Sequence, residues 1–309
     1  MKFWNCFLFL TLTLTVLLSA ACSLQQSPGN VVDGLGRQVT VNAIPQRIVS
    51  LAPSNTEILF ALDLGDNVVG VTEYCNYPAA AQNKPKVGGF STVDLEKVVS
   101  LNPDLVLATR RHAKTVIPAL EKLGITVVAL NPGSLDDVLS SITLVGRITG
   151  QAQRASDLVQ EMAGRITQIT GKTQDLDNKQ RPSVFYVTWH DPLWTAGQGT
   201  LSNDLIEQAG GQNIASDITG DNTINLETVI SRDPEIIIVS VGMGTGEDLP
   251  WQYIKSEPRL KNVRAIVDSR VYKIDGDLID RPGPRSVDAL EELAGYIHPE
   301  LFKENGVTK

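Results

Sequence analysis

The chain has 309 residues, 42% of them hydrophobic, which is enough to build one large or two medium-sized cores. It is acidic, with a formal net charge of −8, and its only adjacent basic residues are the pair Arg110-Arg111. Nucleic acid is therefore excluded as an expected partner, and no polybasic membrane contact is predicted.

The N-terminal segment predicts export. Lys2 is followed by no charged residue until Asp33, and residues 7–18 form an apolar stretch of signal-peptide length. Small residues stand directly before Cys22, as in the lipobox of bacterial lipoproteins, although Ser19 takes the place of the usual Leu. We expect lipid anchoring through Cys22. An uncleaved transmembrane anchor is the alternative, and both place the rest of the chain outside the cytoplasm.

The first half predicts strands that alternate with helices. A short hairpin or edge strand is expected over 34–41, and Ser54 to Glu57 form a capping-box pattern that opens a helix over 58–64. Further strands are expected at 47–51, 68–71 and 127–130, and a further helix near 116–123. Alternation with short loops predicts a parallel sheet in an α/β lobe.

Residues 135–170 have apolar side chains at helical spacing and no strand candidate. The best fit is a break near Gly150, followed by a long helix from about Gln151 to Thr170. Between two α/β halves, such a helix is expected to act as a rigid strut.

The second half repeats the order of the first. A strand at 184–187, a loop at 189–199 and a helix at 202–209 precede a glycine-rich loop at 242–246, a strand at 270–274, a loop at 275–284 and a last helix to about His298. We therefore predict an α/β fold of two similar lobes with central parallel-type sheets, joined by one long α-helix, with a ligand cleft between the lobes. The predicted boundaries are 1–21 for the signal peptide, 22–38 for a tether, 39–145 for the N-terminal lobe, 146–175 for the connecting helix and 181–309 for the C-terminal lobe.

One stretch occurs twice without a gap, as residues 93–107 and 224–238, which we call the twin stretches. In each, apolar residues at i, i+3 and i+4 predict a short helix, Asp94 or Asn225 stands at the N-cap, and Pro103 or Pro234 stops the helix before a buried strand. The copies lie too far apart for a solenoid and suit two similar lobes. Chance likeness of two βα units is the alternative.

Residues that could carry chemistry are sparse. His112, His190 and His298 show no metal-ligand spacing, and neither a nucleophile elbow nor a phosphate-binding loop is present. Cys75 is the single thiol left after processing and is expected to be semi-buried. We expect no cofactor, no metal and no enzymatic activity. An extracytoplasmic enzyme that uses Cys75 or His190 remains the alternative.

The aromatic residues are concentrated in predicted loops. Loops at the carboxyl ends of parallel strands are where α/β sheets bind ligands. The loop aromatics are Tyr74, Tyr77, Phe90, Trp189, Trp194 and Trp251, and the loop after the last strand adds Asp277, Asp280, Arg281 and Arg285 as polar candidates. His112 and His190 are also placed in or near loops, whereas His298 is expected to be a capping or surface residue.

Several segments together resemble a substrate-binding lipoprotein of a cobalamin ABC importer. They are residues 47–57, 71–78, 87–90 and 281–285 and both twin stretches. The broader family is the helical-backbone type of periplasmic binding protein, which also includes iron-siderophore and haem binders, and the likeness extends from about Val39 to Leu301. It implies two α/β lobes joined by one long helix.

The resemblance also implies roles for individual residues. Tyr74 and Phe90 would bind the ligand from the first lobe, and Trp189, Asp277 and Arg281 from the second. Phe90 replaces a Trp, and Asp221 and Asn222 stand where an aromatic is expected, so a ferric siderophore or haem remains an alternative to cobalamin.

The resemblance matches Glu96 and Glu227 to two acidic residues that dock into arginine pockets of the transmembrane subunits. Stabilisation of the helix dipole alone is the alternative role for a first-turn glutamate. We thus expect a monomeric protein, lipid-anchored in the periplasm or at the cell surface, that captures cobalamin as its transported ligand and delivers it to an ABC permease.

Overall fold

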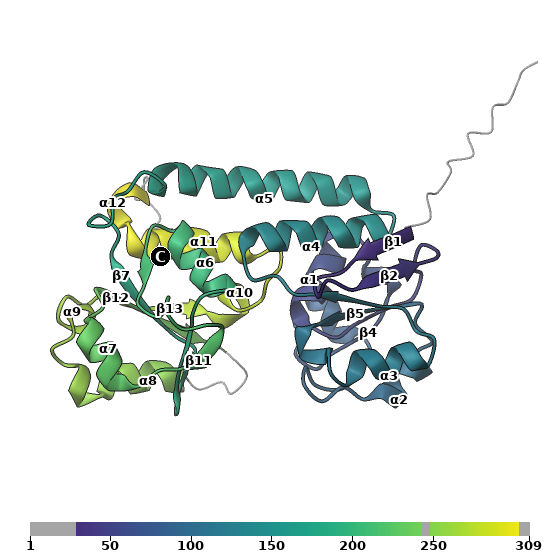
Figure 1. Cartoon of the computed structure of the whole chain (residues 1–309), viewed down its shortest axis with the longest axis horizontal. Helices are drawn as coiled ribbons and strands as arrows, with labels where there is room; N and C mark the ends of the chain where they lie inside the picture. The colour runs from purple at the N-terminus through teal and green to yellow at the C-terminus, as the bar shows by residue number, and fades with distance from the viewer. Residues whose placement is uncertain (1–28, 243–247, 303–309) are drawn as a thin grey trace, which may run out of the picture.

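The N-terminal lobe is built on a parallel sheet of four strands in the order β4-β3-β5-β6 (Figure 1). The computed structural model describes residues 29–242 and 248–302. The sheet strands are β3 (Ile48–Ser50), β4 (Val68–Val71), β5 (Leu105–Thr109) and β6 (Val127–Leu130). With them come α1 (Pro53–Ala61), α2 (Leu95–Ser100), α3 (Val116–Lys122), α4 (Leu135–Ile148), the 3-10 turns η1 (Gly65–Asn67), η2 (Ala79–Asn83) and η3 (Arg110–His112), and the antiparallel hairpin of β1 (Gly29–Val32) and β2 (Gln38–Val41).

The C-terminal lobe has a second four-stranded parallel sheet, in the order β10-β7-β12-β13. Its strands are β7 (Ser183–Val187), β10 (Gln212–Asn213), β12 (Ile236–Val241) and β13 (Val271–Asp275). A small antiparallel sheet consists of β8 (Trp189–His190), β9 (Leu193–Ala196) and β11 (Asp221–Thr223). The helices are α6 (Leu201–Gln208), α7 (Leu226–Arg232), α8 (Leu249–Ser256), η4 (Pro258–Leu260), α9 (Arg264–Val267), α10 (Gly276–Ile279), α11 (Ser286–Ile297) and α12 (Pro299–Phe302).

The long helix α5 (Ala152–Thr173) runs along both lobes (Figure 1). The predicted break is confirmed: α4 ends at Ile148, and Gly150 adopts a φ of +75°, a left-handed conformation that suits glycine. Gly146 lets α4 and α5 approach closely, because a Cβ there would lie 2.3 Å from the Cβ of Ala155. The predicted strut helix is therefore present.

The hydrophobic core is continuous between the lobes. One buried cluster includes Leu105 and Leu107 of β5, Met162 near the middle of α5, and Ile236 and Ile238 of β12. The alternate side chains of the two strands enter a separate cluster in each lobe, as period-2 geometry requires for a sheet buried on both faces. The shared cluster holds both sheets against α5, so the lobes are packed into one body.

The twin stretches form α2 with β5 and α7 with β12, as predicted. The Asp94 carboxylate accepts a hydrogen bond from the Lys97 backbone at 3.1 Å, and the Asn225 side chain accepts one from Thr228 at 2.7 Å. Each copy then turns through a left-handed residue directly before its proline, Asn102 (φ 46°) or Asp233 (φ 43°). The strands also begin at matching positions of the two copies.

Three local predictions are wrong. Helix α1 begins at Pro53 and is capped by the Ala52 backbone without a side-chain bond, because proline at the first helical position suits an earlier start. The loop expected at 189–199 contains β8 and β9, and the loop expected at 275–284 contains α10. The prediction for His298 is confirmed in its capping alternative: it caps the end of α11 and is buried, with Nε2 3.1 Å from the Gly210 carbonyl and Nδ1 2.9 Å from a Glu300 carboxylate oxygen.

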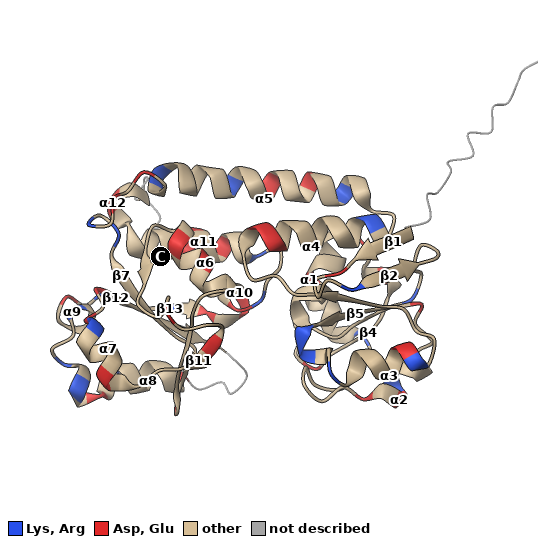
Figure 2. Cartoon of the chain, viewed as in Figure 1, with Lys and Arg blue, Asp and Glu red and all other residues tan. Residues whose placement is uncertain are grey.

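Some predictions concern residues outside the described ranges. The signal peptide, Cys22 and most of the glycine-rich loop at 242–246 are among them. Within the described residues, no helix combines the length and apolar character needed to span a bilayer. Charged residues of both signs lie along α5 in the view of Figure 2, which agrees with a solvated outer face.

Candidate ligand-binding site

The two lobes meet where the loop before α11 approaches α1 (Figure 1). Arg285, in that loop, donates from Nε and Nη2 to the carboxylate of Glu57 on α1, at 2.8 and 2.6 Å. The Glu57 side chain is 2% exposed, and the Arg285 guanidinium also lies 4.1 Å over the Tyr77 ring. Hydrogen bonding to Glu57 raises the pKa of Arg285. This buried pair, the Glu57–Arg285 clasp, joins residues of opposite lobes.

Asp277 and Arg281 lie beside the clasp and pair with each other at 2.5 Å. The side-chain amide of Asn76, from the first lobe, binds both: Arg281 Nη1 donates to Asn76 Oδ1 at 2.6 Å, and Asn76 Nδ2 donates to Asp277 Oδ2 at 2.8 Å. Arg281 also lies 3.6 Å from Glu57. The structure thus brings two predicted site residues together as one donor–acceptor pair, here called the Asp277–Arg281 pair.

Tyr74 and Phe90 belong to neighbouring loops of the first lobe. Tyr74 is 54% exposed. Its ring packs near Gly89, where an added Cβ would lie 3.6 Å from the ring edge. The Phe90 ring meets His112 edge-on at 5.6 Å, and the Phe90 carbonyl lies 2.9 Å from His112 Nε2. His112 is buried, and this burial lowers its pKa. It supports the Phe90 turn from behind and is not itself exposed to a ligand.

Trp189 lies half-buried in the β8–β9 hairpin. Its indole donates to the Asp191 carbonyl at 3.1 Å, and its ring lies 5.0 Å from His190. His190 lies 6.0 Å from the Tyr253 ring, and its Nδ1 is buried without a hydrogen-bond partner among the described residues. No hydrogen bond in the described part of the chain joins Trp189 to the Asp277–Arg281 pair. The hairpin aromatics therefore form a cluster separate from the Asp277–Arg281 pair.

Asp280, predicted as a polar contact for the ligand, instead bonds residues of its own lobe. It is partly buried, and its carboxylate accepts hydrogen bonds from Tyr186 at 2.7 Å, Ser202 at 3.2 Å and Ser240 at 3.1 Å. Burial raises its pKa to about 6. These bonds fix the start of the Arg281 loop to β7, α6 and β12. The thiol of Cys75, predicted to be semi-buried, is fully buried, within 3.2 Å of Thr56.

Sequence reasoning missed Asn76 and the role of Glu57. The capping-box pattern assigned Glu57 to the start of α1, yet it lies inside that helix and pairs across the lobes. The available signal was a glutamate among apolar residues, together with two arginines four residues apart in 281–285. A buried carboxylate requires a partner, and these arginines could supply it. Nothing in the local sequence distinguishes Asn76.

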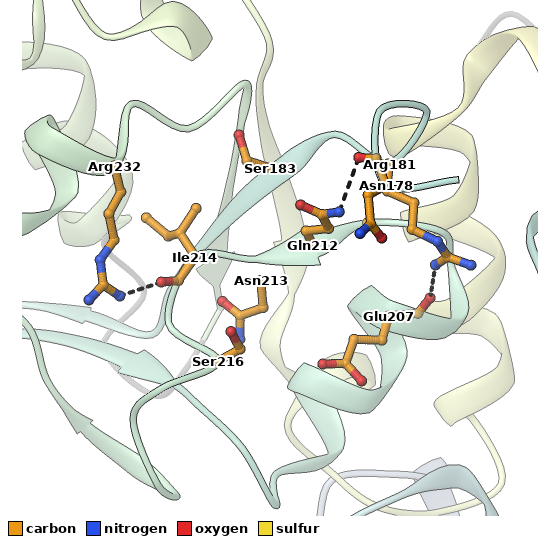
Figure 3. A pocket seen from close by; sticks show the side chains of 10 residues that line it. Asn178, Arg181, Ser183, Glu207, Gln212, Asn213, Ile214, Ser216 and Arg232 are labelled. Atoms are coloured by element: carbon orange, nitrogen blue, oxygen red, sulfur yellow. Dashed lines mark hydrogen bonds between the residues drawn. The ribbon is translucent and has the colours of Figure 1, made fainter. Parts of the chain in front are cut away.

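A hollow of about 570 Å³ lies elsewhere in the C-terminal lobe (Figure 3). Its polar groups are already engaged: Arg232 donates to the Ile214 carbonyl, Arg181 to the Glu207 carbonyl and Gln212 to the Asn178 carbonyl. It opens at the amino ends of β7 and β10, whereas parallel sheets bind ligands at their carboxyl ends. It contains none of the predicted site residues, so we do not assign it to the ligand.

Glu96 and Glu227 are exposed in the first turns of α2 and α7. Both helices lie on the side of the molecule opposite α5 (Figure 1). Glu227 has a neighbour that Glu96 lacks among the described residues, since Arg259 lies 3.4 Å away. The two carboxylates therefore project from equivalent positions of the two lobes.

The chain is similar to known binding proteins over most of its length. An uncharacterised ABC transporter substrate-binding lipoprotein of Bacillus subtilis is 35% identical over 90% of this chain and 88% of its own. A cobalamin-binding protein of Halobacterium salinarum is 31% identical over 90% of this chain and 75% of its own. The structure of a periplasmic haem-binding protein from Roseiflexus sp. RS-1 matches with a TM-score of 0.73 and 26% identity, covering 83% of this chain and 99% of that one.

The family of periplasmic binding proteins matches residues 48–278, and the relatives are substrate-binding proteins rather than enzymes. The family places the protein outside the cytoplasm. The chain belongs to the periplasmic binding protein family and is a substrate-binding protein of an ABC importer.

Proposed function

We propose that this protein captures cobalamin and delivers it to the transmembrane subunits of an ABC importer. The relative of Halobacterium salinarum, named a cobalamin-binding protein, supports this ligand. The proposal includes a signal peptide over residues 1–21, a lipid anchor on Cys22 and action as a monomer. Tyr74, Phe90 and Trp189 would supply aromatic contacts, and the Asp277–Arg281 pair the polar ones.

The observation that carries this proposal is the chemistry of the Asp277–Arg281 pair. It binds the side-chain amide of Asn76 with one donor and one acceptor. Cobalamin carries neutral carboxamide side chains around its corrin ring, and each presents the same two atoms. The propionates of haem offer acceptors alone, so one oxygen would bind Arg281 while the negative charge met Asp277. A paired donor and acceptor thus favours an amide over a carboxylate.

Haem is the second candidate, because of one specific observation. His190 has a buried Nδ1 without a partner among the described residues, next to the Trp189 and Tyr253 rings. Imidazole nitrogen is a common axial ligand of haem iron, and this enclosed Nδ1 would reach an iron only after the His190 ring turns. This arrangement, together with the haem-binding structural neighbour, makes haem the ligand to test against cobalamin.

Equilibrium titration of the purified protein with cyanocobalamin and with haemin tests the proposal. We expect cyanocobalamin to bind at micromolar concentrations or below. Arg281→Ala should weaken it about tenfold, which corresponds to about 1.4 kcal/mol. His190→Ala serves as the comparison variant and should abolish haemin binding if haem is the ligand. Haemin binding without cyanocobalamin binding would overturn the cobalamin assignment.

Docking on the permease is the second part of the proposal. A carboxylate at each end of one packed body would set its orientation on a partner with two arginine pockets. Glu96 and Glu227 meet this need because they are exposed, equivalent in the twin stretches and carried by α2 and α7, which lie on one side of the molecule.

A further inference from the structure

We infer that Asn76 is a resident occupant of the Asp277–Arg281 pair, which the ligand must displace, and that Asn76 thereby lowers the affinity of the site. This inference rests on the proposed function, since it treats the pair as the ligand's polar contact. It assigns an affinity-determining role to a residue of the opposite lobe.

The geometry of Asn76 is that of a bound ligand group. Its amide oxygen accepts from Arg281 at 2.6 Å and its amide nitrogen donates to Asp277 at 2.8 Å, while the two charged side chains hold each other at 2.5 Å. Three side chains form a closed ring in which each bonds the other two. The carboxamide of Asn76 therefore occupies the position that a carboxamide of the ligand would take.

The ring is built to open. The Asp277 and Arg281 side chains are 19% and 15% exposed, and Asn76 itself is exposed, so water and solutes reach these bonds. The Asn76 backbone is held separately, because Gln82 donates to its carbonyl at 3.0 Å. Rotation of one side chain is thus enough to vacate the pair. The neighbouring Glu57–Arg285 clasp stays intact and keeps the lobes together.

Competition with Asn76 lowers the apparent affinity in proportion to the fraction of molecules in which the pair is free. If the ring is open in about a tenth of the molecules, the ligand binds about ten times more weakly than the vacant pair would allow. This factor is the same for every ligand that needs the pair, so discrimination between ligands comes from the Asp277–Arg281 pair itself. A carboxamide replaces both bonds of Asn76, whereas a carboxylate replaces one and places a second negative charge beside Asp277.

Asn76→Ala tests the inference, with Asn83→Ala as the matched control. Asn83 is an exposed asparagine at the end of η2, in the same lobe. Titration with cyanocobalamin should show about tenfold tighter binding for Asn76→Ala, equal to about 1.4 kcal/mol. Asn83→Ala should stay within about twofold of the unmodified protein, the level of ordinary surface substitutions. In an Asp277→Ala background, Asn76→Ala should have a smaller effect, because only the bond from Arg281 still holds Asn76 in place. Unchanged or weaker binding of cyanocobalamin by Asn76→Ala would overturn the inference.

A second measurement needs no ligand and separates this inference from the proposed function. In the ligand-free protein, the Asn76 side-chain amide protons should exchange with solvent more slowly than those of Asn83, measured by NMR. Asp277→Ala should remove that protection. If cyanocobalamin fails to bind the unmodified protein, the proposed function is wrong, while slow exchange still supports the occupant. Exchange as fast as that of Asn83 would show that Asn76 does not occupy the pair, whatever the ligand.

Discussion

The Glu57–Arg285 clasp predicts a large coupling energy between the lobes. The perturbations are Glu57→Ala, Arg285→Ala and the double variant. Each single change removes the hydrogen-bonded partner of the other charge, so that Glu57 keeps only Arg281, 3.6 Å away, in Arg285→Ala, whereas the double change removes both charges. The two single losses in the free energy of unfolding, added together, should therefore exceed the loss in the double variant.

The magnitude follows from burial and bonding. The Glu57 carboxylate is 2% exposed and accepts two hydrogen bonds from Arg285, whose side chain is 17% exposed. Breaking a buried ion pair by removing one partner costs about 3–5 kcal/mol. Arg285 keeps some water and its contact with the Tyr77 ring, so we expect about 3 kcal/mol for each single variant. The coupling energy should be about 2 kcal/mol, within the range found for contacting residues.

Urea unfolding followed by tryptophan fluorescence and by circular dichroism measures these values, and coincident transitions justify the use of free energies. The control cycle is Arg165 with Glu291, an ion pair 2.8 Å apart whose side chains are 32% and 47% exposed. It should yield less than about 1 kcal/mol of coupling, as exposed pairs do. Additive losses at Glu57 and Arg285, with a coupling below about 0.5 kcal/mol, would refute the assignment of the clasp.

Three other variants test separate parts of the molecule. Asp280 has a pKa of about 6 in the folded protein, against an ordinary value of 3.8. Between these two pH values the folded state therefore binds more protons than the unfolded state. The free energy of unfolding should fall by about 3 kcal/mol as the pH rises from about 4 to 7. Asp280→Asn should remove that fall in urea titrations across this range, and an unchanged slope would contradict the burial argument. Glu96→Ala combined with Glu227→Ala should leave cyanocobalamin affinity unchanged but abolish uptake in proteoliposomes carrying the permease; normal uptake would return both residues to helix stabilisation. Cys22→Ser should move the protein from the membrane fraction to the soluble extracytoplasmic fraction, and retention in the membrane would indicate an uncleaved span.

Much of the fold was predictable because local patterns and burial agree. The twin stretches combine an N-cap, an apolar stripe and a proline, and these three signals fixed α2, α7 and the starts of β5 and β12. The long helix was predictable because no strand pattern interrupts its apolar spacing and Gly150 marks the turn before it. Where a proline competed with a side-chain cap, at α1, the prediction failed by several residues.

The cross-lobe contacts were not predictable from local sequence. Asn76 and Asp277 lie 201 positions apart, and Glu57 and Arg285 lie 228 apart, so no period or spacing relates them. Resemblance supplied Asp277 and Arg281 as site residues, but their pairing through Asn76 depends on how the lobes pack. Whether Tyr74, Phe90 and Trp189 contact the ligand stays a prediction.

The packing of the lobes connects the ligand site to the proposed docking surface. The shared core places Met162 of α5 in the same cluster as Leu105 of β5 and Ile236 of β12, the strands that follow α2 and α7. Because close-packed interiors deform little, the separation of Glu96 and Glu227 is set by this core rather than by the loops. Ligand exchange at the Asp277–Arg281 pair then needs only side-chain rearrangement, while the two carboxylates keep a fixed spacing. We therefore expect the ligand state to be sensed by the permease through local changes near Asn76 more than through a large rotation of the lobes.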